Sequence, residues 1–235
     1  MRILFKNIIE DGSISATNES SNYPSSNIAD KFLTKRFKST SVSSVITIDF
    51  LTDQCANSIF YDYHNITSLT AVYKDSLDAV LTTIIIATPE DVGAVYFSRI
   101  ENIRSIEITI NGAIGFYIGG ISTGCYFQVP NILSEYTKPH ADNSIINGNS
   151  YGQKQQVYIK PLLVYNFNFI VGGSTGLEEF VTEYIKYGVG KHLYIDFFEN
   201  NHVKEKPLYA TFGIPIDQDI GKISTSSSMI IEEAR

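Results

Sequence analysis

The chain has 235 residues, which is enough for one large all-β unit or two small domains. Its 43% apolar and 18% charged residues are typical of a globular protein and exclude an intrinsically disordered chain. A formal net charge of -7 argues against direct binding to nucleic acid, which needs a basic face to replace the counterions of the phosphates.

Strands are expected to dominate, because 15 tyrosines, 14 phenylalanines and many β-branched residues suit a pleated, half-buried surface. After a short strand near 3–9, the Ser- and Asn-rich stretch 11–44 is interpreted as a long surface loop. Alternating apolar and polar residues then predict strands at 45–50, 59–63 and 69–73. The continuous apolar run 80–87 predicts a strand covered on both faces.

Two more strands are predicted at 94–99 and 103–110. The dipeptide Asn111-Gly112 is a strong hairpin signal, and it predicts that residues 106–110 pair with 114–118. Short strands at this spacing indicate a β-sandwich or a barrel.

The second half of the chain begins with a polar, Asn-rich segment, 135–155, which we interpret as a linker or projecting loop. Strands are predicted at 156–171, 193–198, 208–212 and 226–232. One amphipathic helix, at about 177–187, is predicted from apolar residues at helical spacing, namely Leu177, Phe180, Val181, Tyr184 and Ile185.

Two GxSxG motifs, around Ser122 and Ser174, match the nucleophile elbow of serine hydrolases. The first lies between two predicted strands, so we interpret it as a glycine-rich turn. The second precedes the helix and is followed by Asp196 and His202, but an elbow needs a parallel sheet flanked by several helices. Because Thr175 to Glu178 also forms a capping box, we expect a helix cap there and no catalytic residue.

No metal site or cofactor is expected. The four histidines lack the spacing of a zinc motif, the acidic pairs lack the pattern of a calcium loop, and phosphate-binding loops are absent from the sequence. Cys55 and Cys125 are predicted to be buried thiols in strands. With neither a signal peptide nor a long apolar run, we expect a cytoplasmically made protein without membrane insertion.

One polar and aromatic cluster is a candidate binding site. It combines the loop around Tyr23 with the strand end near His64, which meet at one rim in a jelly roll. Tyrosine with Asn and His offers a stacking ring and hydrogen bonds to sugar hydroxyls. The candidate glycan contacts are Tyr23, Asn27, Tyr63, His64 and Asn65. We favour the competing interpretation, a turn and strand end packed against a neighbouring subunit, because the chain has no Trp.

The order of short motifs in the first half resembles a known family. The motifs are Asn7-Ile8-Ile9, Asn22 to Ile28, Lys35 to Ser39, Ile46 to Phe50 and Tyr63 to Ile66. This order resembles the opening half of galactose-binding-like (discoidin-type) jelly rolls, as found in phage virion structural proteins. The resemblance covers about residues 1–130, and Phe37 stands where the family usually has Trp.

The second half more loosely resembles phage tail proteins through Tyr151-Gly152-Gln153, the helix and Leu193 to Asp196. The resemblance implies a mostly β protein, with a galactose-binding-like jelly-roll domain at 1–133 and a smaller α+β assembly domain at 134–235. It implies a non-enzymatic tail, tail-tip or neck subunit of the virion. Its partners would be other virion proteins and copies of itself in a ring. The alternative is a carbohydrate-binding module used in host attachment.

Overall fold

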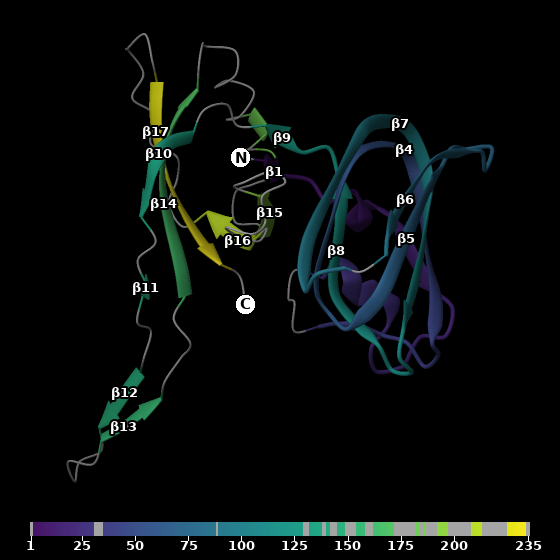
Figure 1. The fold of residues 1–235 in the computed structure, drawn as a ribbon, viewed down its shortest axis with the longest axis horizontal. Helices are drawn as coiled ribbons and strands as arrows, with labels where there is room; N and C mark the ends of the chain where they lie inside the picture. Colours follow the sequence, from purple (N-terminus) through teal and green to yellow (C-terminus); the bar gives the residue numbers. More distant parts are fainter. Residues whose placement is uncertain are drawn as a thin grey trace. The chain divides into compact units, whose positions relative to one another are not determined.

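Strands dominate the structure, which is a computed structural model (Figure 1), and the prediction of a mostly β protein is confirmed. The structure describes residues 2–30, 35–87 and 89–128. In the rest of the chain it describes 132–137, 140–141, 145–148, 154–157, 162–171, 182–183, 186, 192–196, 208–212 and 225–233. The chain divides into two units: unit 1 contains 1–128 and 193–208, and unit 2 contains 129–192 and 209–234.

The main sheet of unit 1 has the strand order β3-β8-β4-β7-β5-β6, with β2 paired to β4. All of the pairings in it are antiparallel. The strands are β2 (Ser13–Ala16), β3 (Phe37–Lys38), β4 (Ser43–His64), β5 (Ile66–Lys74), β6 (Val80–Ile86), β7 (Val92–Gly112) and β8 (Tyr117–Gly124). Two short 3-10 helices, η1 (Ile8–Asp11) and η2 (Ser25–Ala29), precede β3.

Two unusually long strands, β4 and β7, turn this sheet into a sandwich. Their pairing is irregular between Asp49 and Ser58, which bends both strands. Figure 1 shows them arching over the upper end of unit 1, so that both ends of each strand lie at the lower end. The first half of β4 pairs with β2, and its second half pairs with β8. The arrangement is therefore a β-sandwich, as predicted.

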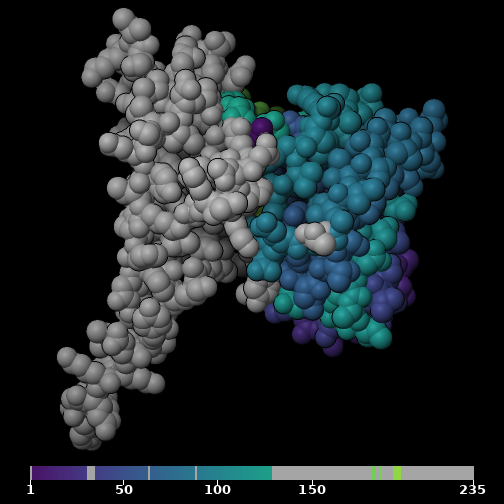
Figure 2. Space-filling view, in the orientation of Figure 1, coloured from purple at the N-terminus to yellow at the C-terminus, as the bar shows by residue number. Residues whose placement is uncertain are grey.

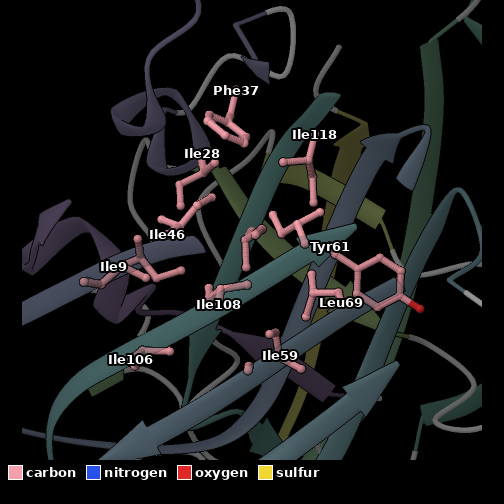
Figure 3. Packing of buried hydrophobic residues seen from close by; sticks show 14 of the residues in the cluster. Ile9, Ile28, Phe37, Ile46, Ile59, Tyr61, Leu69, Ile106, Ile108 and Ile118 are labelled. Carbon is pink, nitrogen blue, oxygen red and sulfur yellow. The ribbon is translucent and has the colours of Figure 1, made fainter. Parts of the chain in front are cut away.

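The core lies inside the sandwich and follows the period of two that strands impose. In β4 the buried side chains are Ile46, Ile48 and Phe50, and the residues between them are more exposed. Ile106, Ile108 and Ile110 repeat the pattern in β7. Figure 3 shows Ile46, Ile108, Ile118 and other labelled residues of this cluster gathered between the strands, with Phe37 at one end.

Three further strands of unit 1 pair with one another and join distant parts of the chain. β1 (Arg2–Leu4) pairs with both β9 (Phe127–Gln128) and β15 (His192–Asp196). Tyr194 lies against Phe60 of β4, with ring centroids 5.2 Å apart. The buried carboxylate of Asp196 accepts a 2.6 Å hydrogen bond from the Tyr96 hydroxyl, so β15 is fastened to β7.

The strands of unit 2 pair in the order β10-β14-β17-β16, with the short strand β11 on β14 and the separate hairpin β12–β13. The strands are β10 (Ile132–Thr137), β11 (His140–Ala141), β12 (Ile145–Gly148), β13 (Lys154–Val157), β14 (Leu162–Val171), β16 (Leu208–Phe212) and β17 (Thr225–Glu233). The strands predicted near 208–212 and 226–232 are confirmed.

One interpretation in the second half of the chain is wrong. The segment 135–155, expected to be a linker or loop, contributes to β10, β11, β12 and β13. The helix predicted at about 177–187 lies outside the described residues except for 182, 183 and 186. Within the part of the chain that is described, no helix has the length and apolar character needed to cross a membrane.

The hairpin predicted at Asn111-Gly112 is wrong. Strand β8 pairs with β3 and β4 instead of β7, because the second half of β7 already has β4 on one side and β5 on the other. A local turn signal cannot report that both edges of a strand are occupied. The stretch 11–44 is also more than a loop, since it contains β2, η2 and β3.

Strand β6 is a further correction, because it is not covered on both faces. It stands at the end of the described sheet, paired to β5. Its residues Val80, Leu81 and Ile85 are 60%, 37% and 71% exposed, whereas Ile86 is buried. Continuous apolar sequence therefore marks an exposed edge here, an unusual place for such residues.

Candidate functional site

The ends of three strands meet at the lower end of unit 1. β3 pairs with the start of β8 through Lys38 and Tyr117, and Ile118 of β8 pairs in turn with His64 at the end of β4. In Figure 2, purple N-terminal residues and teal residues of the β8 region lie side by side at this end, in agreement with the pairing. We call Tyr23, Arg36, Lys38, Asn65 and Tyr117 the β3–β8 rim.

Tyr23 presents an accessible ring at the rim. The side chain is 41% exposed, and the Tyr23 carbonyl accepts a 3.2 Å hydrogen bond from the Lys38 amide. This bond holds Lys38 beside the tyrosine, with its ammonium nitrogen 5.9 Å from the ring centroid. An exposed aromatic face and a cation therefore stand next to each other.

Arg36 and Tyr117 form a second aromatic and cationic pair. The Arg36 guanidinium lies 4.5 Å from the centroid of the Tyr117 ring. The side-chain amide of Asn27 donates a 3.0 Å hydrogen bond to the Arg36 carbonyl, which ties η2 to the residue before β3. Asn27 thus supports the rim through the backbone.

Asn65 fixes the position of Tyr117 from the other side. The side-chain oxygen Oδ1 of Asn65 accepts a 2.7 Å hydrogen bond from the backbone amide of Tyr117. The backbone amide of Asn65 donates to the Tyr117 carbonyl at 3.2 Å. Asn65 is exposed, and no described residue accepts a hydrogen bond from its side-chain nitrogen. That nitrogen is a donor available to a ligand.

Both ring nitrogens of His64 are used within the fold. Nε2 lies 2.6 Å from the Glu90 carbonyl, which can only accept, so Nε2 carries the proton. Nδ1 then accepts a 3.4 Å hydrogen bond from the Ile66 amide. Burial lowers the pKa of His64, while the Glu90 carbonyl acts in the opposite direction. His64 is therefore a neutral residue that positions the Glu90 segment.

Acidification should destabilise the protein through His64. Its pKa is lower in the folded state than in the unfolded chain, so the unfolded state binds the proton first. The stabilisation is complete above the unfolded pKa, about 6.5, and is lost as the pH falls towards the folded pKa. Between about pH 7.5 and 5.5, the melting temperature of the wild type should fall more steeply than that of His64→Gln. Parallel pH curves for the two proteins would contradict this assignment.

The predicted glycan contacts have different environments. Tyr23 and Asn65 reach the rim with exposed side chains, whereas Asn27 and His64 act on the backbone around it. Tyr63 lies in β4, and its side chain is outside the described residues. Sequence reasoning missed three rim residues: Arg36, Lys38 and Tyr117. Their only signal was position, because β3 and the start of β8 become neighbours only when the sheet forms.

The serine motif around Ser122 does not form an elbow. The motif around Ser122 is part of β8, and Ser122 is buried, so the expectation of a glycine-rich turn is wrong. Ser174 and His202 lie outside the described residues. Asp196 is described, and it is buried beneath the Tyr96 hydroxyl. Among described residues, no three His, Cys, Asp or Glu side chains are grouped to hold a metal ion.

The chain matches no model of a known protein family, and it matches no curated protein. Several solved structures are similar to half of it. A chitosan-binding module from a chitosanase/glucanase of Paenibacillus sp. IK-5 is 12% identical, with a TM-score of 0.43, over 50% of this chain and 96% of the module.

Two other similar structures are also binding modules. A fucose-binding module of Streptococcus pneumoniae is 12% identical, with a TM-score of 0.44, over 50% of this chain and 96% of its own. The lectin-binding domain of lectinolysin, complexed with Lewis b, is 7% identical, with a TM-score of 0.45, over 52% of this chain and 96% of its own.

Proposed function

We propose that unit 1 is a non-enzymatic carbohydrate-binding module and that the β3–β8 rim is its site. The observation that carries the proposal is the exposed Tyr23 ring beside the Lys38 ammonium. The apolar face of a sugar ring can stack on tyrosine, and its hydroxyls can accept hydrogen bonds from a cation next to it.

The rest of the rim supplies donors in the same row. Lys38 stands opposite Tyr117 in the strand register, and the Arg36 guanidinium lies over the Tyr117 ring. The side-chain nitrogen of Asn65 adds an amide donor. Lysine, arginine and this nitrogen all donate, so the rim suits a sugar rich in oxygen acceptors, and a carboxylated sugar more than an amino sugar.

Glycan binding by rim variants tests the proposal. The array should include fucose, Lewis b and chitosan oligosaccharides, together with acidic glycans. We expect saturable binding by the wild type, weakened about 10-fold or more by Tyr23→Ala and by Lys38→Ala. Leu77→Ala, at an 85% exposed side chain in the turn before β6, is the matched control and should bind like the wild type. Equal loss in the control, or retained binding in both rim variants, would sink the assignment.

We propose as a second function that the chain is a structural subunit of a phage particle, in a tail, tail tip or neck. The exposed apolar side chains of β6 favour it, because an apolar strand edge can pair with another copy of the chain in a ring. In this proposal 1–133 is the jelly-roll domain and 134–235 the assembly domain. Mass spectrometry of purified particles should find the chain at a fixed stoichiometry with tail proteins; its absence would contradict the proposal.

A further inference from the structure

The two cysteines of the chain face each other in unit 1. The sulfur atoms of Cys55 and Cys125 are 2.8 Å apart, although the residues are separated by 70 positions. Cys55 lies within the irregular part of β4, and Cys125 is the first residue after β8. Both are free thiols, and both are half-buried and not fully buried as expected. Cys55 lies in a strand as expected, but Cys125 does not.

The backbone on both sides holds this geometry. Ser58 and Gly124 are paired in the sheet, and the Ser58 hydroxyl donates a 2.9 Å hydrogen bond to the Gly124 carbonyl. On the other side, the Tyr126 amide donates to Oδ1 of Asn57 at 2.9 Å. Because a disulfide bond is about 2.05 Å long, the sulfurs need to approach by less than about 1 Å to form one.

The surroundings give the two thiols different reactivities. The Cys125 thiol donates its hydrogen to Cys55, and this lowers the pKa of Cys55 to about 6. Nη2 of Arg99 lies 3.8 Å from the Cys55 sulfur and also favours the thiolate, whereas burial opposes it. The same hydrogen bond raises the pKa of Cys125. Cys55 is therefore the nucleophile, since the thiolate is the reactive form.

We propose that Cys55 and Cys125 are a site of reversible disulfide formation by exchange with a small disulfide such as oxidised glutathione. The Cys55 thiolate attacks one sulfur of the reagent, whose S–S bond breaks to release one thiolate. Cys125 then gives its proton to water and attacks the Cys55 sulfur, which releases the second thiolate. The two protein thiols are oxidised, and one reagent disulfide is reduced to two thiols.

The disulfide would link β4 to the residues that follow β8, near residue 128, where the first segment of unit 1 ends. Cys125 precedes Tyr126, whose ring lies 5.2 Å from that of Tyr96 and 4.8 Å from the Arg2 guanidinium. Closing a loop between residues 70 positions apart restricts the unfolded chain. Oxidation should therefore raise the melting temperature of the protein by about 5–15 °C.

Intact-mass measurement of the full chain tests the inference. The reduced protein is incubated with oxidised glutathione, and free thiols are then blocked under denaturing conditions. We expect the wild type to lose about 2 Da without retaining glutathione. Cys125→Ser should keep one glutathione on Cys55, a gain of about 305 Da, and Cys55→Ser should react at least about 10-fold more slowly.

Three results would overturn the inference. These are a wild type that keeps both free thiols, a wild type that carries a stable glutathione on each cysteine, and equal reaction rates for the two serine variants. Reduction of the oxidised wild type should reverse both the mass change and the rise in melting temperature. This test uses only the wild-type protein, so it does not depend on whether a serine variant folds. If reduction reverses neither change, the inference is wrong.

Discussion

Ile108→Ala should lower the free energy of unfolding by about 2–5 kcal/mol. Ile108 lies at the centre of the sandwich, fully buried, and in the register it stands between Ile46 of β4 and Ala71 of β5. Truncation removes apolar contacts and leaves a cavity that these paired strands cannot close. Chemical denaturation monitored by circular dichroism measures the loss.

Ile85→Ala provides the matched control, because it makes the same change on an edge strand. The Ile85 side chain is 71% exposed on β6. Its truncation should change the free energy of unfolding by no more than about 0.5 kcal/mol. Comparable losses for the two variants would mean that Ile108 does not lie in the core of the sandwich.

Asp196→Ala should cost about 2–4 kcal/mol of unfolding free energy. The buried carboxylate accepts the Tyr96 hydroxyl at 2.6 Å and stands opposite Arg2 in the register. The Arg2 guanidinium lies 4.0 Å from the Tyr96 ring centroid. Removal of the carboxylate therefore takes an acceptor from a partly buried hydroxyl and a negative charge from the neighbourhood of a cation.

Asp196→Asn separates these two effects in the same denaturation assay. Its side-chain oxygen can still accept the Tyr96 hydroxyl, so the loss should be smaller than for Asp196→Ala. A loss below about 0.5 kcal/mol for the alanine variant would contradict the attachment of β15 to β7.

Local patterns predicted most of the long strands but not their partners. Alternation located Ile46, Ile48 and Phe50 on one buried face, and it located β5 in the same way. The hairpin failed because Asn111-Gly112 reports only a turn, whereas the partner of β8 is decided by which sheet edges are free. The continuity of β4 and β7 through their bends is likewise a property of the assembled sandwich.

The sequence likewise predicted some residues of the candidate site and missed others. The loop of Tyr23 and the strand end at Asn65 stood out because tyrosine and amide side chains gather there. Lys38 and Tyr117 did not, because they become neighbours only through the pairing of β3 with β8. The role of His64 depended on the carbonyl of Glu90, and the sequence gives no indication that this carbonyl is near. Proximity across the sheet is therefore the missing information in each case.

Chemical-shift mapping of isotope-labelled protein tests most directly whether the β3–β8 rim binds carbohydrate. The protein is titrated with a carboxylated sugar, which the donors of the rim favour, and with the strongest ligand found on the glycan array. Saturable amide shifts should centre on Tyr23, Lys38, Asn65 and Tyr117, where the rim residues share backbone hydrogen bonds and strand pairing. Saturable shifts confined to another part of unit 1, or no shifts with any of these sugars, would contradict binding at the rim.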